Sequence, residues 1–190
     1  MTTYVAFSTA WPLRKSNAIA LPNGPEMTLI QQSCENATAR IRFFRIAFGT
    51  TTDTRLISTA DARKVLTDYY AFTRLSATWR VDQDRARNVV QLGYLSLLCL
   101  EAAMPQGGTL DITDNGRVLI ATAKAETVRG DLPIWDMLKP GVGCDLPGLR
   151  PADVQFALLA RICSETGVTA DLQYNIGHAQ LILILPGADV

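Results

Sequence analysis

The chain has 190 residues, 48% of them hydrophobic, which is enough to bury a sizeable core as one large domain or as a small element plus one domain. Its 18 basic and 18 acidic residues balance to zero formal charge, so nucleic acid and anionic membranes are not expected partners. No signal peptide and no membrane-length apolar segment is recognisable, and the four scattered cysteines form no C-x-x-C pair. We therefore expect a cytoplasmic protein with reduced, mostly buried thiols.

Residues 3–21 carry a loose apolar pattern that is compatible with a helix, although Pro12 would kink or end it. If this stretch is helical, the turn at residues 22–25 joins it to the next helix as an antiparallel hairpin.

The stretch from Glu26 to Phe48 has the most regular pattern in the chain. Its apolar residues recur at alternating steps of three and four, as a heptad seam: Met27, Ile30, Cys34, Ala37, Ile41, Phe44 and Phe48. This predicts a helix roughly 35 Å long that begins near Pro25 and stops at Gly49. One amphipathic helix cannot bury such a seam alone, so we expect a homodimer interface here. An ordinary core helix of one domain is the alternative.

The polar linker at residues 49–54 is the best boundary, and it predicts a helical domain at 1–50 and a second domain at 55–190. In the second domain, Ser58 is a plausible N-cap for a helix over 60–75, with Asp61 three residues on. Residues 75–81 alternate as a half-buried strand. Residues 82–104 then read as a second long helix, which is apolar on nearly every side from Val89 and therefore buried.

The remainder of the chain alternates strands with one more helix. Strands are expected at 109–113 and 117–124 around Asn115-Gly116, followed by an irregular stretch at 128–148 with one helical turn near Trp135. A helix begins at Pro151 and is closed by Gly167, and its expected apolar stripe consists of Val154, Leu158 and Ile162. A hairpin of residues 168–174 and 179–185 ends the chain. This order predicts an α+β fold with helices on one face of a mixed or antiparallel sheet.

Three segments of the chain resemble the ChpT-type bacterial histidine phosphotransferases: residues 35–49, 97–110 and 151–159. The resemblance covers about residues 24–186. It implies a homodimer in which two helical hairpins form a four-helix bundle, followed by a degenerate Bergerat, or histidine-kinase-like, α/β sandwich. It also implies a two-component phosphorelay in which a histidine on the first hairpin helix takes phosphate from one receiver domain and passes it to another. No cofactor, ATP or metal is implied for the phosphotransferase itself.

The residues argue against ATP binding. The magnesium-binding asparagine of kinases with this fold corresponds to Cys99 here, and a thiol is a poor ligand for a hard cation. No Asp-x-Gly-x-Gly loop follows the strand at 117–124, where only residues 125–128 stand. The glycine pair at Gly141 and Gly143 is a weak signal.

The phosphoacceptor is also missing. The only histidine, His178, falls in the tip of the last expected hairpin and reads as a solvated turn residue. If Pro12 matches the proline of the family, the acceptor position falls near Phe7, with Ser8 after it, and neither residue forms a labile phosphoramidate. We therefore expect no catalytic, cofactor-binding or metal-binding residues.

Three interpretations of the function remain. The first is a non-catalytic relative that keeps the dimer and binds receiver domains of response regulators or hybrid kinases. The second is an active phosphotransferase whose histidine-bearing helix is missing or misread in this sequence. The third, an ATP-binding kinase or ATPase, is disfavoured by Cys99 and by the absent glycine loop. A small-molecule binding module lacks a convergent cluster of polar residues.

Overall fold

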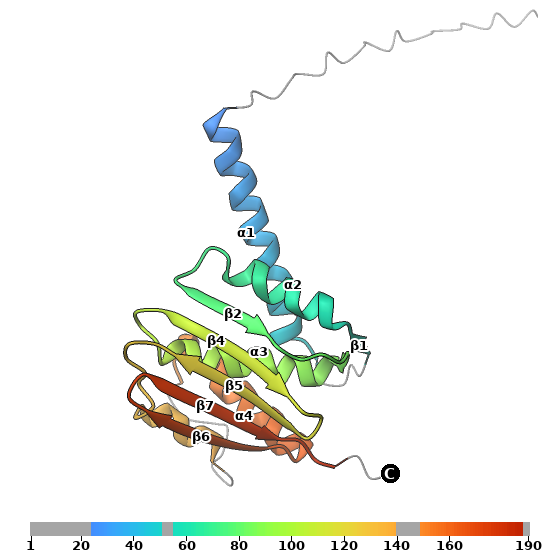
Figure 1. The fold of residues 1–190 in the computed structure, drawn as a ribbon, viewed down its shortest axis with the longest axis vertical. Coiled ribbons are helices and arrows are strands. Elements are labelled where there is room, and N and C mark those ends of the chain that lie inside the picture. The colour runs from blue at the N-terminus through green and yellow to red at the C-terminus, as the bar shows by residue number, and fades with distance from the viewer. Residues whose placement is uncertain (1–23, 51–54, 140–148, 188–190) are drawn as a thin grey trace, which may run out of the picture.

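A computed structural model of the protein describes residues 24–50, 55–139 and 149–187. A long helix, α1 (Pro25–Ala47), stands on a body that contains a five-stranded sheet, a two-stranded ribbon and the helices α2, α3 and α4 (Figure 1). The helix predicted over Glu26–Phe48 is confirmed, with Gly24 as its N-cap and Pro25 as its first residue. Within the described residues, no helix combines the length and apolarity needed to span a bilayer. The expected hairpin helix at 3–21, Gly141, Gly143 and Cys144 lie outside the described residues.

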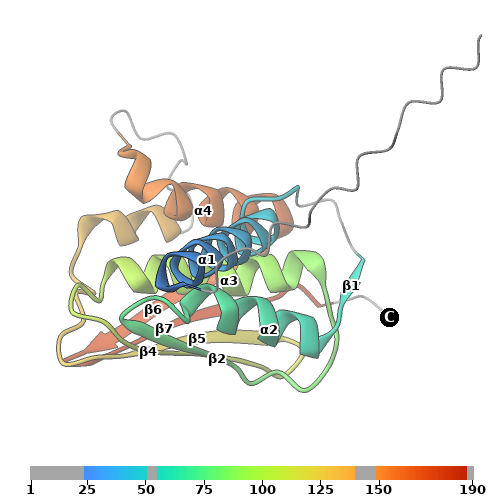
Figure 2. The ribbon, with the colours of Figure 1, turned by 90° about the horizontal axis from the view of Figure 1, so that it is seen from above.

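The sheet has five strands in the order β2-β4-β5-β7-β6, and its helices gather on one face (Figure 2). Only β2 and β4 run parallel, so of the two predicted alternatives, a mixed or an antiparallel sheet, the structure has the mixed one. The strands are β2 (Leu75–Trp79), β4 (Gly108–Asp114), β5 (Val118–Lys124), β6 (Thr169–Asn175) and β7 (His178–Ile184). In β2, Leu75 and Trp79 are buried between exposed residues, as the alternation predicts.

Helix α2 (Thr59–Tyr70) begins where its N-cap predicts. The Ser58 hydroxyl accepts the Asp61 N–H at 3.0 Å and donates to the Asp61 carboxylate at 2.7 Å. The helix ends at Tyr70 and not at Leu75, because the Thr73 hydroxyl accepts the Leu75 N–H at 3.1 Å and forms a turn into β2.

The second long helix is shorter than predicted. Helix α3 covers Arg87–Ala102, while Arg85–Ala86 form β3 and pair antiparallel with β1 (Leu56–Ile57). The Asp84 carboxylate holds this ribbon by accepting the Thr59 N–H at 2.9 Å. The prediction that the helix is buried and central is confirmed, because its residues from Val90 to Leu97 are all buried.

The C-terminal elements follow the sequence closely. The Asn115 side chain accepts the N–H groups of Arg117 and Val118 in the β4–β5 turn, and Gly116 takes the positive φ of 95° that favours glycine. The short 3-10 helix η1 (Pro133–Leu138) contains Trp135. A second one, η2 (Pro151–Asp153), precedes α4 (Val154–Thr166), which Gly167 closes with a φ of 72°.

The predicted apolar stripe of α4 is partly wrong. Val154 is 44% exposed, whereas the buried residues include Phe156, Leu159 and Ile162. The difference arises because the 3-10 turn delays the α-helix, and because Phe156 packs edge-on against Trp135 at 4.9 Å between ring centroids. Helix α4 therefore presents a different face to the core.

Candidate functional site

The lower half of α1 is built into the core of the body. Its buried residues are Ala39, Phe43, Ile46 and Ala47. The Phe43 ring stacks against the rings of Tyr69 at 3.9 Å and Tyr94 at 4.7 Å, which belong to α2 and α3. These contacts fix the direction in which the helix leaves the body.

Side chains of α3 bind carbonyl groups in the last turn of α1 and just after its end. Gln91, which is only 1% exposed, donates from its amide to the carbonyls of Ala47 at 3.1 Å and Gly49 at 2.9 Å. The Arg87 guanidinium donates to the Arg45 carbonyl. The end of a helix has no N–H groups of its own for these acceptors, so this clamp satisfies them and ties α1 to α3.

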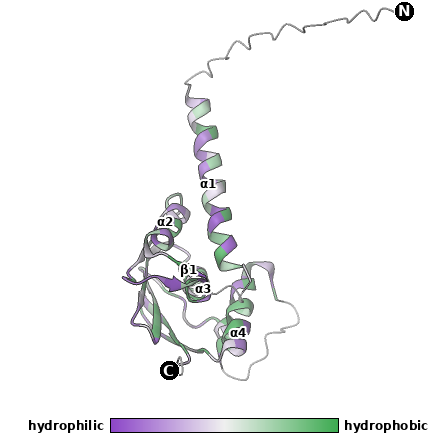
Figure 3. Cartoon of the chain, turned by 90° about the vertical axis from the view of Figure 1, so that its right-hand side faces the viewer, coloured by the Kyte–Doolittle hydropathy of each residue, from purple (hydrophilic) through white to green (hydrophobic). Residues whose placement is uncertain are grey.

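The predicted seam is exposed along most of its length, and its lower end, Phe44 and Phe48, borders the body, where Phe44 meets Tyr69. Ile30 is 56% exposed, Ile41 60%, and Phe44 and Phe48 39% each, while Cys34 and Ala37 are also exposed and Met27 is half-buried. At about 100° per residue the seam and the body-facing residues fall on roughly opposite sides of the helix. Apolar residues recur along the projecting part (Figure 3). The described residues leave the seam between Ile30 and Ile41 exposed.

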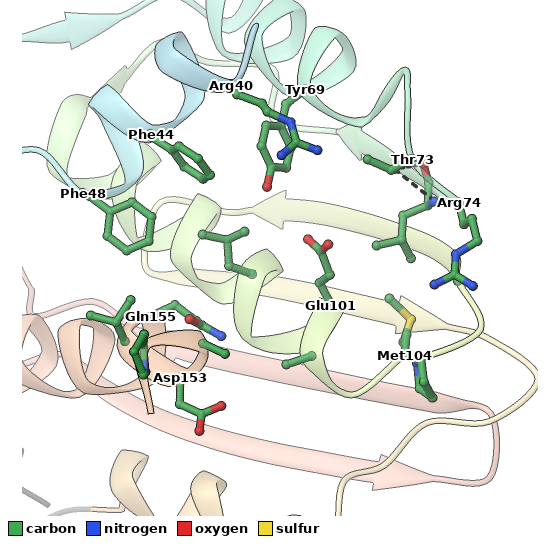
Figure 4. Close-up of a pocket in the computed structure, with 18 of the residues that line it drawn as sticks. Arg40, Phe44, Phe48, Tyr69, Thr73, Arg74, Glu101, Met104, Asp153 and Gln155 are labelled. Atoms are coloured by element: carbon green, nitrogen blue, oxygen red, sulfur yellow. Dashed lines mark hydrogen bonds between the residues drawn. The ribbon is translucent and has the colours of Figure 1, made fainter. Parts of the chain in front are cut away.

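A cavity of about 1010 Å³ lies at the base of α1, between that helix, the ends of α2 and α3, and the start of α4 (Figure 4). Phe44 and Phe48 belong both to the seam and to the cavity wall. Their rings meet edge-on at 5.6 Å, and Phe44 meets Tyr69 at 5.7 Å. The charged residues that line the cavity are Arg40, Arg74, Glu101, Arg150 and Asp153.

Glu101 of α3 occupies the middle of this cavity (Figure 4). One of its carboxylate oxygens accepts the Tyr70 hydroxyl at 3.1 Å. Burial raises the pKa of Glu101, and the Tyr70 hydrogen bond and the charge of Arg40 offset this only in part. Burial, followed by the Glu101 charge, likewise raises the pKa of Tyr69 to about 12. The cavity therefore stabilises the ionised carboxylate poorly.

The acid at the other side of the cavity is already paired. Asp153 is 8% exposed, and the Arg150 guanidinium donates to both of its oxygens at 2.7 Å and 3.2 Å. Bidentate pairing and the Asp153 charge raise the pKa of Arg150. This pair presents little net charge to a ligand.

The structure places Cys99 and Cys163 inside the core. Cys99 is fully buried in α3, and burial raises the pKa of its thiol well above the usual value. The expectation of mostly buried thiols holds for these two cysteines and is wrong for Cys34, which is exposed on the seam. The described residues contain no group of three acidic, histidine or cysteine side chains arranged to hold a metal.

His178 begins β7, opposite Lys124 of β5 and Asn175 of β6. Alternate residues Ala179, Leu181 and Leu183 are buried under the helices. His178 therefore belongs to the opposite, open face of the sheet, away from α1.

Sequence reasoning missed Phe43, Gln91 and Glu101. Phe43 lies outside the heptad seam, and its burial depends on aromatic partners far away in the chain. Gln91 and Glu101 are polar residues within the apolar run of α3. A polar side chain in a buried helix needs a hydrogen-bond partner, and this requirement could have marked both residues in the sequence.

A family defined as the histidine phosphotransferase C-terminal domain matches residues 59–177, more than half of the chain. The protein phosphotransferase ChpT of Brucella abortus (strain 2308) is 34% identical over 109 residues, which are 54% of this chain and 52% of that protein. The chain belongs to the ChpT-type histidine phosphotransferase family.

The solved structure of a bacterial phosphotransferase superposes on this family member with a TM-score of 0.68 at 28% identity, covering 83% of this chain and 77% of that one. The Acinetobacter baumannii histidine kinase AdeS gives a TM-score of 0.48 at 12% identity, and the superposition covers 86% of this chain and 79% of that one. The chain spans about half the length of the curated ChpT relative that it matches.

Proposed function

We propose that this chain is a homodimeric component of a two-component phosphorelay that binds receiver domains of response regulators or hybrid kinases and has no phosphoacceptor histidine of its own. The observation that carries the proposal is an exposed heptad seam on α1, in a histidine phosphotransferase whose only histidine lies on the open face of the sheet. The two parts of the proposal are supported by different residues.

Dimerisation is supported by the upper part of α1. Residues 28–35 are all exposed, and the side-chain bonds that they make, such as Ser33 to the Leu29 carbonyl, stay within the helix. A helix without tertiary contacts is marginally stable in water. A second copy that covers Ile30, Cys34 and Ile41 would bury the seam and order this part of the helix.

Ile41→Glu should convert the dimer into a monomer. Ile41 is 60% exposed in the single chain, so the substitution should leave the body intact and place an unpaired charge in the interface. Because a two-fold interface carries the change twice, we expect the dissociation constant to rise at least about a hundredfold. Light scattering coupled to size-exclusion chromatography measures the mass.

Ile176→Glu is the matched control for Ile41→Glu. Ile176 is 98% exposed at the β6–β7 turn, far from the seam, and its substitution should leave the dimer unchanged. A wild-type chain that is cleanly monomeric at micromolar concentration would overturn the dimer.

No phosphate should transfer from a phosphorylated receiver domain to this chain. No imidazole precedes His178 in the sequence, and serine or threonine would form an ester too stable to return its phosphate. His178 lies on the sheet face away from α1, where it lacks the placement that in-line transfer needs. The measurement follows radiolabel from a phospho-receiver on both proteins. Acid-labile, base-stable label on this chain that disappears in His178→Ala would contradict the proposal.

The same proposal includes no ATP site. The family resemblance puts Cys99 at the position of the magnesium ligand, and its thiol is fully buried and a poor ligand for a hard cation.

A further inference from the structure

Beyond the proposed receiver binding, we propose a docking site at the edge of the sheet that lies away from α1 (Figure 1). The outer edge of β6 and the groove beside it take an extended segment of a partner protein, which adds a strand to the sheet. In that segment, apolar residues alternate with at least one lysine or arginine.

The register of the sheet directs a row of backbone groups of β6 outward. The Ala125 N–H donates to the Gly177 carbonyl at 3.0 Å, so odd-numbered positions along β7 face β5 and even-numbered positions face β6. The even-numbered residues of β7 pair with the odd-numbered residues of β6. The N–H and C=O groups of Ala170, Leu172 and Tyr174 therefore point away from the sheet, and no described residue binds them. These groups can pair with one more strand.

Strand β6 lacks the features that protect many edge strands from pairing. It has seven residues, with no lysine and no proline, and Asp171 is its only charged residue. An edge of this kind readily pairs with another chain. A second copy of this chain is disfavoured as that partner, because two-fold pairing of β6 with β6 would bring two Asp171 carboxylates close together.

A groove of about 440 Å³ runs beside the same edge. One wall contains the three outward-directed residues of β6, and the other is formed by the segment 130–139, which includes η1. An added residue that pairs with Leu172 turns its side chain to the same face of the sheet and so into this groove. Because Leu132 and Pro133 line the groove with Leu172, an aliphatic side chain fits there. The groove thus supplies side-chain selection, as in other sites where a peptide adds a strand.

The charge beside β6 selects a basic residue in the added strand. The charged residues that line the groove are Asp131, Asp136, Lys139 and Asp171. Lys139 pairs with Asp136, whereas Asp131 and Asp171 have no cation among the described residues. The Asp171 carboxylate accepts the Gln173 amide at 3.0 Å and keeps its charge. Since Asp171 alternates with the groove-facing residues, lysine or arginine between two apolar residues of the added strand lies beside it.

A peptide library tests the site directly. Phage that display random nine-residue peptides are selected on the immobilised full chain, with an empty support as the reference. We expect the enriched sequences to alternate apolar residues with lysine or arginine. Enrichment of acidic sequences, or no enrichment over the empty support, would overturn the proposal.

N-methylation of the most enriched peptide tests backbone pairing. In an added strand, alternate amides donate to β6 and the amides between them point to solvent. Methylation of the first set should weaken binding at least about tenfold in calorimetry, and methylation of the second set should leave binding nearly unchanged. Equal losses from the two sets would rule out strand addition.

The double variant Asp131→Asn/Asp171→Asn tests the role of charge. Asparagine keeps an oxygen for the Gln173 amide, so β6 should be retained. We expect the peptide to bind about tenfold more weakly, with a difference that shrinks at high salt. Asp82→Asn is the matched control, because Asp82 is exposed on the loop after β2, at the other edge of the sheet. A double variant that is folded by circular dichroism and binds like the wild type would contradict the proposal.

Self-pairing of β6 has a separate signature. The Leu172 N–H points outward, so Leu172→Pro removes no hydrogen bond between β6 and β7. In the Ile41→Glu background we expect a monomer with or without Leu172→Pro, measured by light scattering. A dimer of Ile41→Glu that Leu172→Pro dissociates would assign this edge to a second copy and overturn the proposal.

Discussion

Phe43→Ala should lower the free energy of unfolding by about 3–5 kcal/mol. The Phe43 ring is fully buried and stacks on both Tyr69 and Tyr94, so the substitution leaves a cavity where α1, α2 and α3 meet. Loss of two stacked pairs adds to the loss of buried area. Chemical denaturation monitored by circular dichroism measures the change.

Phe72→Ala provides the comparison for Phe43→Ala, because Phe72 is 51% exposed after the end of α2. We expect it to cost roughly 1 kcal/mol or less. Similar losses for the two variants would show that Phe43 is not the contact that secures α1 to the body.

Asp114→Ala should destabilise the protein by about 3–5 kcal/mol, through a different mechanism. The Asp114 side chain is fully buried, and the Arg85 side chain is 19% exposed. One Asp114 carboxylate oxygen lies 2.7 Å from the Arg85 Nε, as an ion pair without hydrogen-bond geometry. The other carboxylate oxygen of Asp114 accepts the Gly116 N–H at 2.6 Å. Alanine would strand the Arg85 charge and also remove an acceptor in the β4–β5 turn.

Asp111→Ala tests whether burial causes this effect. Asp111 lies on the same strand and pairs with Arg80 at 2.9 Å, but the Arg80 side chain is 61% exposed. An exposed pair contributes about 0–1 kcal/mol, so thermal and urea unfolding should separate the two variants clearly. Equal losses would contradict the role assigned to the buried pair.

The elements that were predicted correctly carry their signals locally. Pro25 with the heptad pattern defined α1, Ser58 defined the start of α2, and Asn115-Gly116 defined the β4–β5 turn. Each signal acts within a few residues of the structure that it specifies, through a cap, a turn or a periodic face.

The prediction at residues 82–86 failed because the deciding contact is distant. Arg85–Ala86 form a strand only because Leu56–Ile57 lie beside them, and the Asp84 carboxylate binds the Thr59 N–H. Residues 82–86 carry no helix-breaking signal of their own. Helix propensity is a weak prior that such tertiary pairing overrides.

Only the part of the candidate site that depends on local sequence signals was predicted. The seam from Met27 to Phe48 follows from periodicity, and its exposure agrees with a face that awaits a partner, although the homodimer stays a prediction. The domain boundary at 49–54 also stays a prediction. The cavity around Glu101 joins four elements, and no spacing within one segment encodes it.

The clamp formed by Gln91 and Arg87 makes α1 and the body move together as one rigid unit. Carbonyl groups at the end of α1 are held by α3, so bending at this junction would break these hydrogen bonds, of which the one from Gln91 to the Ala47 carbonyl is buried. A tilt of the roughly 35 Å helix by about 10° displaces one end by roughly 6 Å relative to the other. In a dimer joined along α1, a small change in the crossing angle of the two helices would therefore produce a large displacement of the two bodies. The distance between the bodies would then depend on that crossing angle.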